Sequence, residues 1–174
     1  MAGEIEIIDE VIAQHKILRA NLLDVRNSLT DFDALFRLQK AQAAWAQSSV
    51  NKLQDQKRQF QDTLTRVQRG VEGHFTWEER VLQPLFGEAF MKALLFVHNQ
   101  IRQQIKQTIA VADSASVEGL SQEDILEQKS RLEDATSRTN TMLEEHAGLE
   151  EQMLMMLKRT FEGEAKSTGA KQTT

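Results

Sequence analysis

The sequence predicts an all-α protein that folds as an up-down-up-down antiparallel four-helix bundle. Apolar residues recur at steps of three and four, the breaks in this pattern are few and short, and the 174 residues include only one proline and eight glycines. Helices joined by short connections become antiparallel neighbours in a bundle. We therefore expect one helical domain over residues 1–162 and a disordered polar tail over residues 163–174, GEAKSTGAKQTT.

Four segments carry the helical pattern, each with an apolar seam along one face. The first seam consists of Val11, His15, Leu18, Leu22, Val25, Leu29, Phe32 and Phe36. The second consists of Val50, Leu53, Phe60, Leu64, Val67, Val71, His74, Glu78, Val81 and Leu85, with Lys57 as a polar intruder. The third consists of Leu94, His98, Ile101 and Ile105, with Ile109 near the same face. The fourth consists of Ile125, Leu132, Ala135, Met142, His146, Leu149, Met153 and Met156.

The predicted breaks are Gln47–Asn51 (QSSVN), Pro84–Glu88 (PLFGE) and Asp113–Asp124 (DSASVEGLSQED). Proline and glycine end helices in the second break, and Ser121 followed by Asp124 resembles a capping box in the third. A first break at Trp45–Ser49 (WAQSS) would fit the positions of the histidines better.

Composition excludes several classes of protein. Without cysteine there are no disulfides, thiolate zinc sites, iron–sulfur clusters or cysteine nucleophiles. The net charge of −5 and the lack of a Lys/Arg stripe argue against nucleic acid as a partner. No apolar run approaches the ~18 residues of a membrane span, and the acidic start, MAGEIEIIDEVIAQ, is unlike a signal peptide. We expect a cytoplasmic monomer or homodimer.

The four histidines, His15, His74, His98 and His146, fall one on each predicted helix, and each lies on its seam. Counting residues from each histidine to the adjacent turns places all four roughly 18–22 Å from the same end of the bundle, at 1.5 Å per residue. This count requires the first turn to lie near position 45. We therefore expect the four imidazoles to meet in the core.

Two carboxylates belong to the same layer, because Glu78 and Glu150 follow His74 and His146 at i+4 in the paired sequences HFTWEE and HAGLEE. A lone buried histidine is usually an ordinary core residue, but four with two carboxylates would be costly to bury without a cation. Imidazole and carboxylate together suit iron, with manganese or zinc as possible substitutes. The remaining alternative is a bundle whose histidines hold adventitious metal or none.

The spacing between histidine and glutamate distinguishes the known families of metal-binding helical proteins. Ferritin-like proteins need Glu three residues before His, but those positions are Ile12, Val71, Leu95 and Leu143, and the zinc-protease helix H-E-x-x-H is absent. The observed order, H…HxxxE…H…HxxxE, resembles the hemerythrin-like (HHE cation-binding) family. The resemblance runs from about Glu4 to Phe161, and its best pieces are QHKILRANL, GHFTWEERVLQPLF and EEHAGLEEQML.

The resemblance implies a non-haem di-iron centre with an oxo or hydroxo bridge. Its terminal ligands would be His15, His74, His98 and His146, and its bridging carboxylates Glu78 and Glu150. Oxygen-carrying hemerythrins have a further histidine where this chain has Arg102, and an aspartate where it has Glu151, which competes with Glu150. The pattern is closer to the iron–sulfur cluster repair di-iron proteins and to the iron-sensing domain of an F-box ubiquitin ligase.

The expected function is binding of dioxygen or nitric oxide for sensing, storage or protection. The alternatives are iron storage or donation, iron-centre repair, and a ferroxidase or peroxidase type of enzyme. No catalytic residue is indicated outside the metal ligands, so binding ranks above catalysis, and the cysteine-bearing segment of the repair proteins has no counterpart here. Phe75, Trp77, Phe86 and Phe96 would either wall a gas pocket or simply pack the core.

Overall fold

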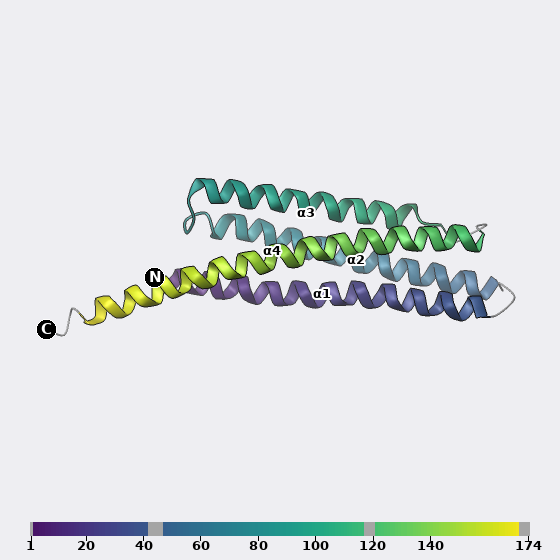
Figure 1. Cartoon of the computed structure of the whole chain (residues 1–174), viewed down its shortest axis with the longest axis horizontal. Coiled ribbons are helices and arrows are strands. Elements are labelled where there is room, and N and C mark those ends of the chain that lie inside the picture. The colour runs from purple at the N-terminus through teal and green to yellow at the C-terminus, as the bar shows by residue number, and fades with distance from the viewer. Residues whose placement is uncertain (1, 42–46, 117–120, 171–174) are drawn as a thin grey trace.

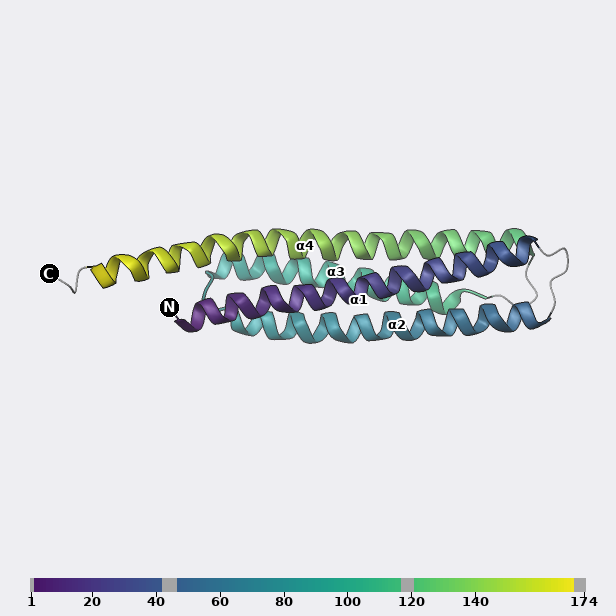
Figure 2. The same ribbon diagram turned by 90° about the horizontal axis from the view of Figure 1, so that it is seen from below.

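The computed structural model describes the backbone of residues 2–41, 47–116 and 121–170, and the side chains of residues 3–30, 51–116, 121 and 123–163. These ranges form four helices: α1 (Ala2–Ala41), α2 (Gln47–Val81), α3 (Glu88–Ser114) and α4 (Gln122–Ala170). The helices lie side by side and alternate in direction (Figures 1 and 2). Contacts join α1 to α2, α2 to α3, α3 to α4 and α4 back to α1. The predicted all-α, up-down-up-down antiparallel four-helix bundle is confirmed.

Two of the three predicted breaks are confirmed. Between α2 and α3 the chain turns tightly, and the backbone amides of Leu85 and Phe86 donate to the Leu82 carbonyl at 3.0 and 3.1 Å. Before α4, Ser121 and Asp124 form the predicted capping box, because each backbone amide donates to the other side chain at 3.1 Å.

The first predicted break is wrong. Residues 47–51 are the first residues of α2, and the break lies between Ala41 and Gln47, where residues 42–46 are outside the described residues. The prediction depended on two serines, which are tolerated in the first turn of a helix. A connection here agrees with the requirement for a turn near position 45.

The C-terminal helix passes the predicted domain boundary. The backbone of α4 stays helical to Ala170, although we expect a disordered tail from residue 163. In Figures 1 and 2 this end of α4 projects beyond the other helices. Residues 171–174 lie outside the described residues, so their disorder stays a prediction.

The core consists of two apolar clusters that flank the histidine layer. The cluster at the end with the α2–α3 turn contains Ile8, Val11, Leu82, Met91, Leu94 and Leu154. The larger cluster, toward the other end, contains Leu18, Leu22, Val25, Phe60, Leu64, Val67, Val71, Phe75, Ile101, Ile105, Ala112, Leu132 and Leu143. The histidine layer is thus enclosed along the bundle axis by apolar side chains, which exclude water from it.

The fourth predicted seam is wrong beyond His146. Leu149, Met153 and Met156 are exposed by 64, 39 and 68%. The buried positions after His146 are instead Ala147, Glu150 and Leu154. They follow the 3.6-residue period of a straight helix, whereas the predicted seam assumes steps of a 3.5-residue repeat. The predicted seam residues Phe32, Phe36 and Val50 lie outside the described side chains.

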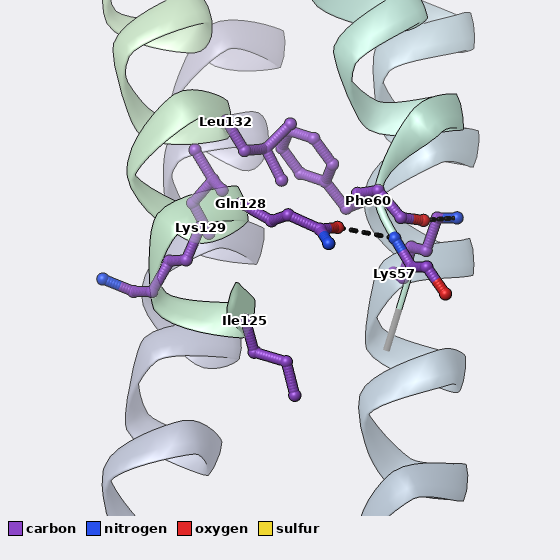
Figure 3. Close-up of a pocket in the computed structure, with 9 residues that line it drawn as sticks. Lys57, Phe60, Ile125, Gln128, Lys129 and Leu132 are labelled. Atoms are coloured by element: carbon purple, nitrogen blue, oxygen red, sulfur yellow. Dashed lines mark hydrogen bonds between the residues drawn. The ribbon is translucent and has the colours of Figure 1, made fainter. Parts of the chain in front are cut away.

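Polar contacts hold Ala115 and Ser116, which follow α3, against α2 and α4 (Figure 3). The Lys57 ammonium donates a hydrogen bond to the Ala115 carbonyl. The Gln128 side-chain oxygen accepts a hydrogen bond from the Ser116 backbone amide at 2.6 Å. Beside them lies an apolar cavity of about 20 Å³, which is the size of one water molecule. Within the described ranges, no helix has the length and apolar character that crossing a membrane requires.

Candidate metal centre

The structure brings all six predicted site residues together in the core. Each helix contributes one histidine, and the exposed fractions of His15, His74, His98 and His146 are 0, 5, 0 and 7%. The ring centroids of His15 and His74 are 4.9 Å apart, and those of His98 and His146 are 4.8 Å apart. The expectation that the four imidazoles meet at one level is confirmed.

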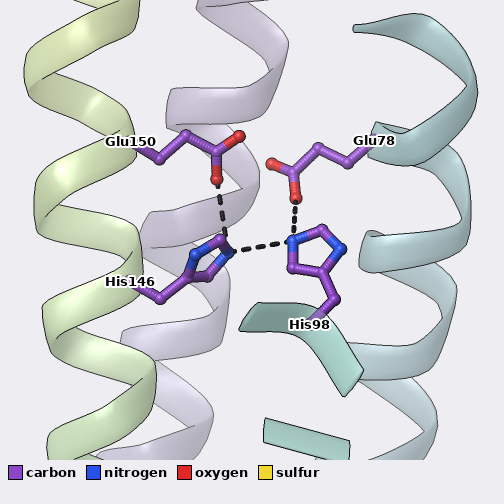
Figure 4. Close-up of side chains that lie close together, drawn as sticks. All are labelled: Glu78, His98, His146 and Glu150. Carbon is purple, nitrogen blue, oxygen red and sulfur yellow. Dashed lines mark hydrogen bonds and ion pairs between the residues drawn. The ribbon is translucent and has the colours of Figure 1, made fainter. Parts of the chain in front are cut away.

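The two carboxylates enter the same layer. Glu78 and Glu150 are exposed by 0 and 1%. Each lies one helical turn after a histidine, so the His74 Nε2 to Glu78 Oε1 distance is 3.1 Å and the His146 Nε2 to Glu150 Oε2 distance is 3.3 Å. Figure 4 shows Glu78 and Glu150 facing one another across the core, above the rings of His98 and His146.

The donor atoms form two overlapping groups, each compact enough to surround one ion. One group is His15, His74 and Glu78, and the other is Glu78, His98, His146 and Glu150. Glu78 belongs to both, with Oε1 3.4 Å from His15 Nε2 and Oε2 3.5 Å from His98 Nε2. Glu150 also reaches the first group, since its Oε2 is 3.6 Å from His15 Nε2. Both carboxylates therefore lie between two pairs of imidazoles.

Most of these donor atoms have no hydrogen-bond partner. The Nε2 atoms of His15 and His74 and both oxygens of Glu78 and Glu150 are buried without one. Native proteins rarely leave buried polar atoms unpaired, since each such atom costs about 1–3 kcal/mol. Cations between the two pairs of imidazoles would satisfy all of them, so the donor set fits a metal site.

The family comparison agrees with this geometry. The profile of the hemerythrin HHE cation-binding domain matches residues 6–158. The chain belongs to the hemerythrin HHE cation-binding family. Searches of the curated proteins and of the solved structures gave no match. The family and the buried His/Glu cluster together fit a metal-binding protein, and the two overlapping donor groups are the part of this HHE domain that could hold the metal.

Three histidines of the HHE domain are held from outside by hydrogen bonds that their Nδ1–H groups donate. The acceptor is Gln14 for His74, at 2.9 Å, and Glu79 for His98, at 2.8 Å. The Nδ1 atom of His15 lies 3.2 Å from Glu151. Carboxylates only accept, so the proton is on Nδ1 and Nε2 is directed at the centre. The side-chain NH2 group of Gln14 donates a hydrogen bond to Glu10 at 2.9 Å, so the side-chain oxygen of Gln14 faces His74.

Glu79 and Glu151 lie outside the donor groups, although each directly follows a carboxylate inside them. Their side chains are exposed by 22 and 25%, against 0 and 2% for Glu78 and Glu150. The geometry thus favours Glu150 over Glu151 as the inward carboxylate of α4. The outward role of Glu79, Glu151 and Gln14 was not predicted, although the repeated HxxxEE sequence contains the first two.

Arg102, which replaces a fifth histidine, points away from the donor groups. Its guanidinium donates to Glu72 at 2.8 Å and to Glu79 at 2.9 Å, and it lies 5.3 Å from the ring centroid of Phe75. The fully buried Phe75 ring stacks on His98 with a centroid distance of 3.7 Å and an interplanar angle of 3°. Phe75 therefore covers one face of a candidate ligand.

The other three aromatic residues near the histidines do not form a wall around the centre. Phe96 is 63% exposed. Trp77 and Phe86 are partly buried against the cluster at the α2–α3 end. For these three residues the structure indicates packing or surface positions, and Phe75 alone fits the predicted wall.

Burial and the neighbouring charges set the protonation of the donor set. Burial by itself would raise the pKa of Glu78, but His15 and His74 lower it to about 2. Burial would likewise lower the pKa of His15, but Glu150 and Glu78 raise it to about 9. The Glu78 carboxylate and the His15 imidazolium therefore form a buried ion pair at neutral pH.

Glu150, His98 and His146 carry less charge at neutral pH than Glu78 and His15. Burial raises the pKa of Glu150 to about 7, with the nearby Glu78 charge adding to the effect. Burial and the neighbouring His98 lower the pKa of His146 to about 3, and burial lowers that of His98. At pH 7 the donor set thus stores protons on His15 and, in part, on Glu150, and an incoming cation must displace them.

Proposed function

We propose that this protein binds two iron ions in the buried centre and uses them to bind dioxygen or nitric oxide, for sensing, storage or protection. The observation that carries the proposal is the pair of overlapping donor groups that share Glu78. His15 and His74 would hold one ion, and His98 and His146 the other. Glu78 and Glu150 would bridge them.

The donor chemistry supports iron. Four imidazole nitrogens and two carboxylates make a mixed N/O set without thiolates, which suits iron and also accommodates manganese or zinc. Two buried carboxylates between four rings require positive charge nearby, and bound cations provide it more directly than stored protons. Manganese and zinc are therefore the substitutes to test.

The small number of side-chain donors supports binding of a diatomic gas. The irons would supply redox chemistry and coordination positions that the protein leaves open, because Arg102 is directed outward to Glu72 and Glu79. Phe75 limits access of water on the His98 side. Apolar clusters close the layer above and below, so only small molecules would enter without rearrangement.

The second candidate function is iron handling, meaning storage, donation or use in repair of iron centres. Arg102 in the position of a fifth histidine favours it, because fewer protein ligands make an ion easier to release. Ferroxidase or peroxidase chemistry is the third candidate. A cytoplasmic location, a monomeric or homodimeric state and the lack of a nucleic-acid partner remain predictions.

The test is an optical titration of the protein reconstituted anaerobically with Fe(II). Exposure to oxygen should produce charge-transfer bands that disappear under vacuum, and nitric oxide should give a separate spectrum. Irreversible oxidation would contradict gas binding and favour iron handling or an enzyme. His74→Ala should abolish the bands, whereas Glu145→Ala, which alters an exposed residue beside His146, should leave them unchanged.

A further inference from the structure

The site is built twice, from two halves of the chain with the same pattern. Helices α1 and α3 carry H-x-x-x-R, and helices α2 and α4 carry E-x-H-x-x-x-E-E. The first half supplies His15, Arg19, Glu72, His74, Glu78 and Glu79. The second half supplies His98, Arg102, Glu144, His146, Glu150 and Glu151. Histidines and inward carboxylates account for half of these residues, so the arginines and the other glutamates also need an explanation.

On one side of the bundle, Arg102 and Glu79 join the ligand histidine His98 in a hydrogen-bonded group that we call the α2–α3 triad. A single oxygen of Glu79 lies 2.8 Å from His98 Nδ1 and 2.9 Å from Arg102 Nη1. The other edge of the guanidinium donates to Glu72 at 2.8 Å. Arg102 follows His98 by one helical turn, so the triad joins α3 to α2 directly outside the centre.

On the opposite side, the α1–α4 triad of Arg19, Glu151 and His15 repeats this geometry. One oxygen of Glu151 lies 3.2 Å from His15 Nδ1 and 2.6 Å from Arg19 Nη1. Arg19 Nε donates to Glu144 at 2.9 Å. The same arrangement on two different helix pairs argues against chance surface ion pairing.

We propose that Glu79 and Glu151 are positioning residues that fix the rings of His98 and His15 with Nε2 directed at the metal. Each carboxylate accepts the Nδ1 proton, and the arginine beside it holds the carboxylate in place through a charge-assisted hydrogen bond. Outer carboxylates of this kind orient ligand histidines and raise their basicity, and their loss typically weakens metal binding about 10–100-fold. The inference rests on the proposed metal function.

The two halves differ in one respect, which provides an internal reference. Gln14, directly before His15, accepts from His74, but the corresponding residue before His98 is the apolar Val97. Among the described residues, no hydrogen bond to Nδ1 of His146 is found. His146 therefore has no outer carboxylate to lose, and its ring should not respond to changes at Glu79 or Glu151.

The test compares Glu79→Ala, Glu79→Gln, Glu151→Ala and Glu151→Gln with the wild type and with Glu145→Ala as a matched exposed control. All three substituted positions are partly or fully exposed, so helicity should be retained. Affinity for Zn(II) is measured by chelator competition. The tautomer of each histidine is read from ¹⁵N NMR of the metal-free and zinc-loaded proteins.

We expect each alanine variant to bind zinc about 10–100-fold more weakly, with a smaller loss for each glutamine variant, which keeps an oxygen acceptor. The Nδ1–H tautomer of His98 should be lost in Glu79→Ala and that of His15 in Glu151→Ala, with His146 unchanged in both. Wild-type affinity and tautomers in the alanine variants would overturn the proposal, as would equal losses for alanine and glutamine. If the wild type bound no metal, the proposed function would fail, and the His98 tautomer of the metal-free protein would still decide the positioning role of Glu79.

Discussion

Loading the centre with metal should release protons. At pH 7, a pKa of about 9 keeps His15 protonated, and a pKa of about 7 leaves Glu150 half protonated. The pKa values of Glu78, His98 and His146 are lowered, so these groups are mostly unprotonated at pH 7 and contribute little. Binding should therefore release about 1.5 protons per chain from these groups. With the ordinary pKa values of 6.5 and 4.5, His15 and Glu150 would together release only about 0.2.

The same protons make metal affinity depend on pH. Each unit by which pH lies below the His15 pKa weakens binding about tenfold, so affinity should rise about 100-fold between pH 7 and pH 9. Proton release is measured by calorimetric titration of anaerobic Fe(II) into the metal-free protein in buffers of different ionisation enthalpy. Deprotonation of a bridging water would only add to the count. A release below about 0.5 proton at pH 7 would refute the assigned protonation of His15 and Glu150.

Three further predictions concern stability and stoichiometry. The metal-free protein should lose about 3 kcal/mol of unfolding free energy between pH 6.5 and pH 9, because the raised His15 pKa stabilises the fold below 6.5 and that stabilisation is lost through pH 9; urea unfolding at both pH values would disprove this if it showed no decrease. Phe75→Ala should cost about 3–5 kcal/mol in the same assay, since the ring is fully buried, and Phe75→Leu should cost less. Glu78→Gln should reduce bound iron below one ion per chain, because both donor groups share this carboxylate, and full occupancy in elemental analysis would contradict its bridging role.

The layer of histidines could be predicted because helix geometry converts residue counts into heights. His74 and His98 lie nearly equally far from the α2–α3 turn, which proline and glycine mark clearly. The first connection had no such marker, and the serines at the start of α2 were mistaken for it. The position of this connection matters for the level of His15, because the predicted level requires a turn near position 45. The connection between Ala41 and Gln47 meets that requirement.

The outward residues could not be assigned in the same way. Sequence spacing shows that Glu78 and Glu79 occupy neighbouring positions on α2, but it does not show where α3 lies. Only the packing of α3 against α2 brings Arg102 to Glu79 and leaves Glu78 in the core. The exposure of Leu149 and Met153 could not be predicted either, because it depends on which face of α4 is directed at the core after many helical turns.

The central claim, that two ions share Glu78 in one buried layer, is tested most directly by anomalous diffraction at the iron edge from iron-loaded crystals. Two peaks are predicted, one bonded to Nε2 of His15 and His74 and the other to Nε2 of His98 and His146. The Glu78 carboxylate should lie between the peaks, with one oxygen on each. A single peak, or peaks bonded to Glu79 or Glu151 in place of the inward carboxylates, would contradict the claim.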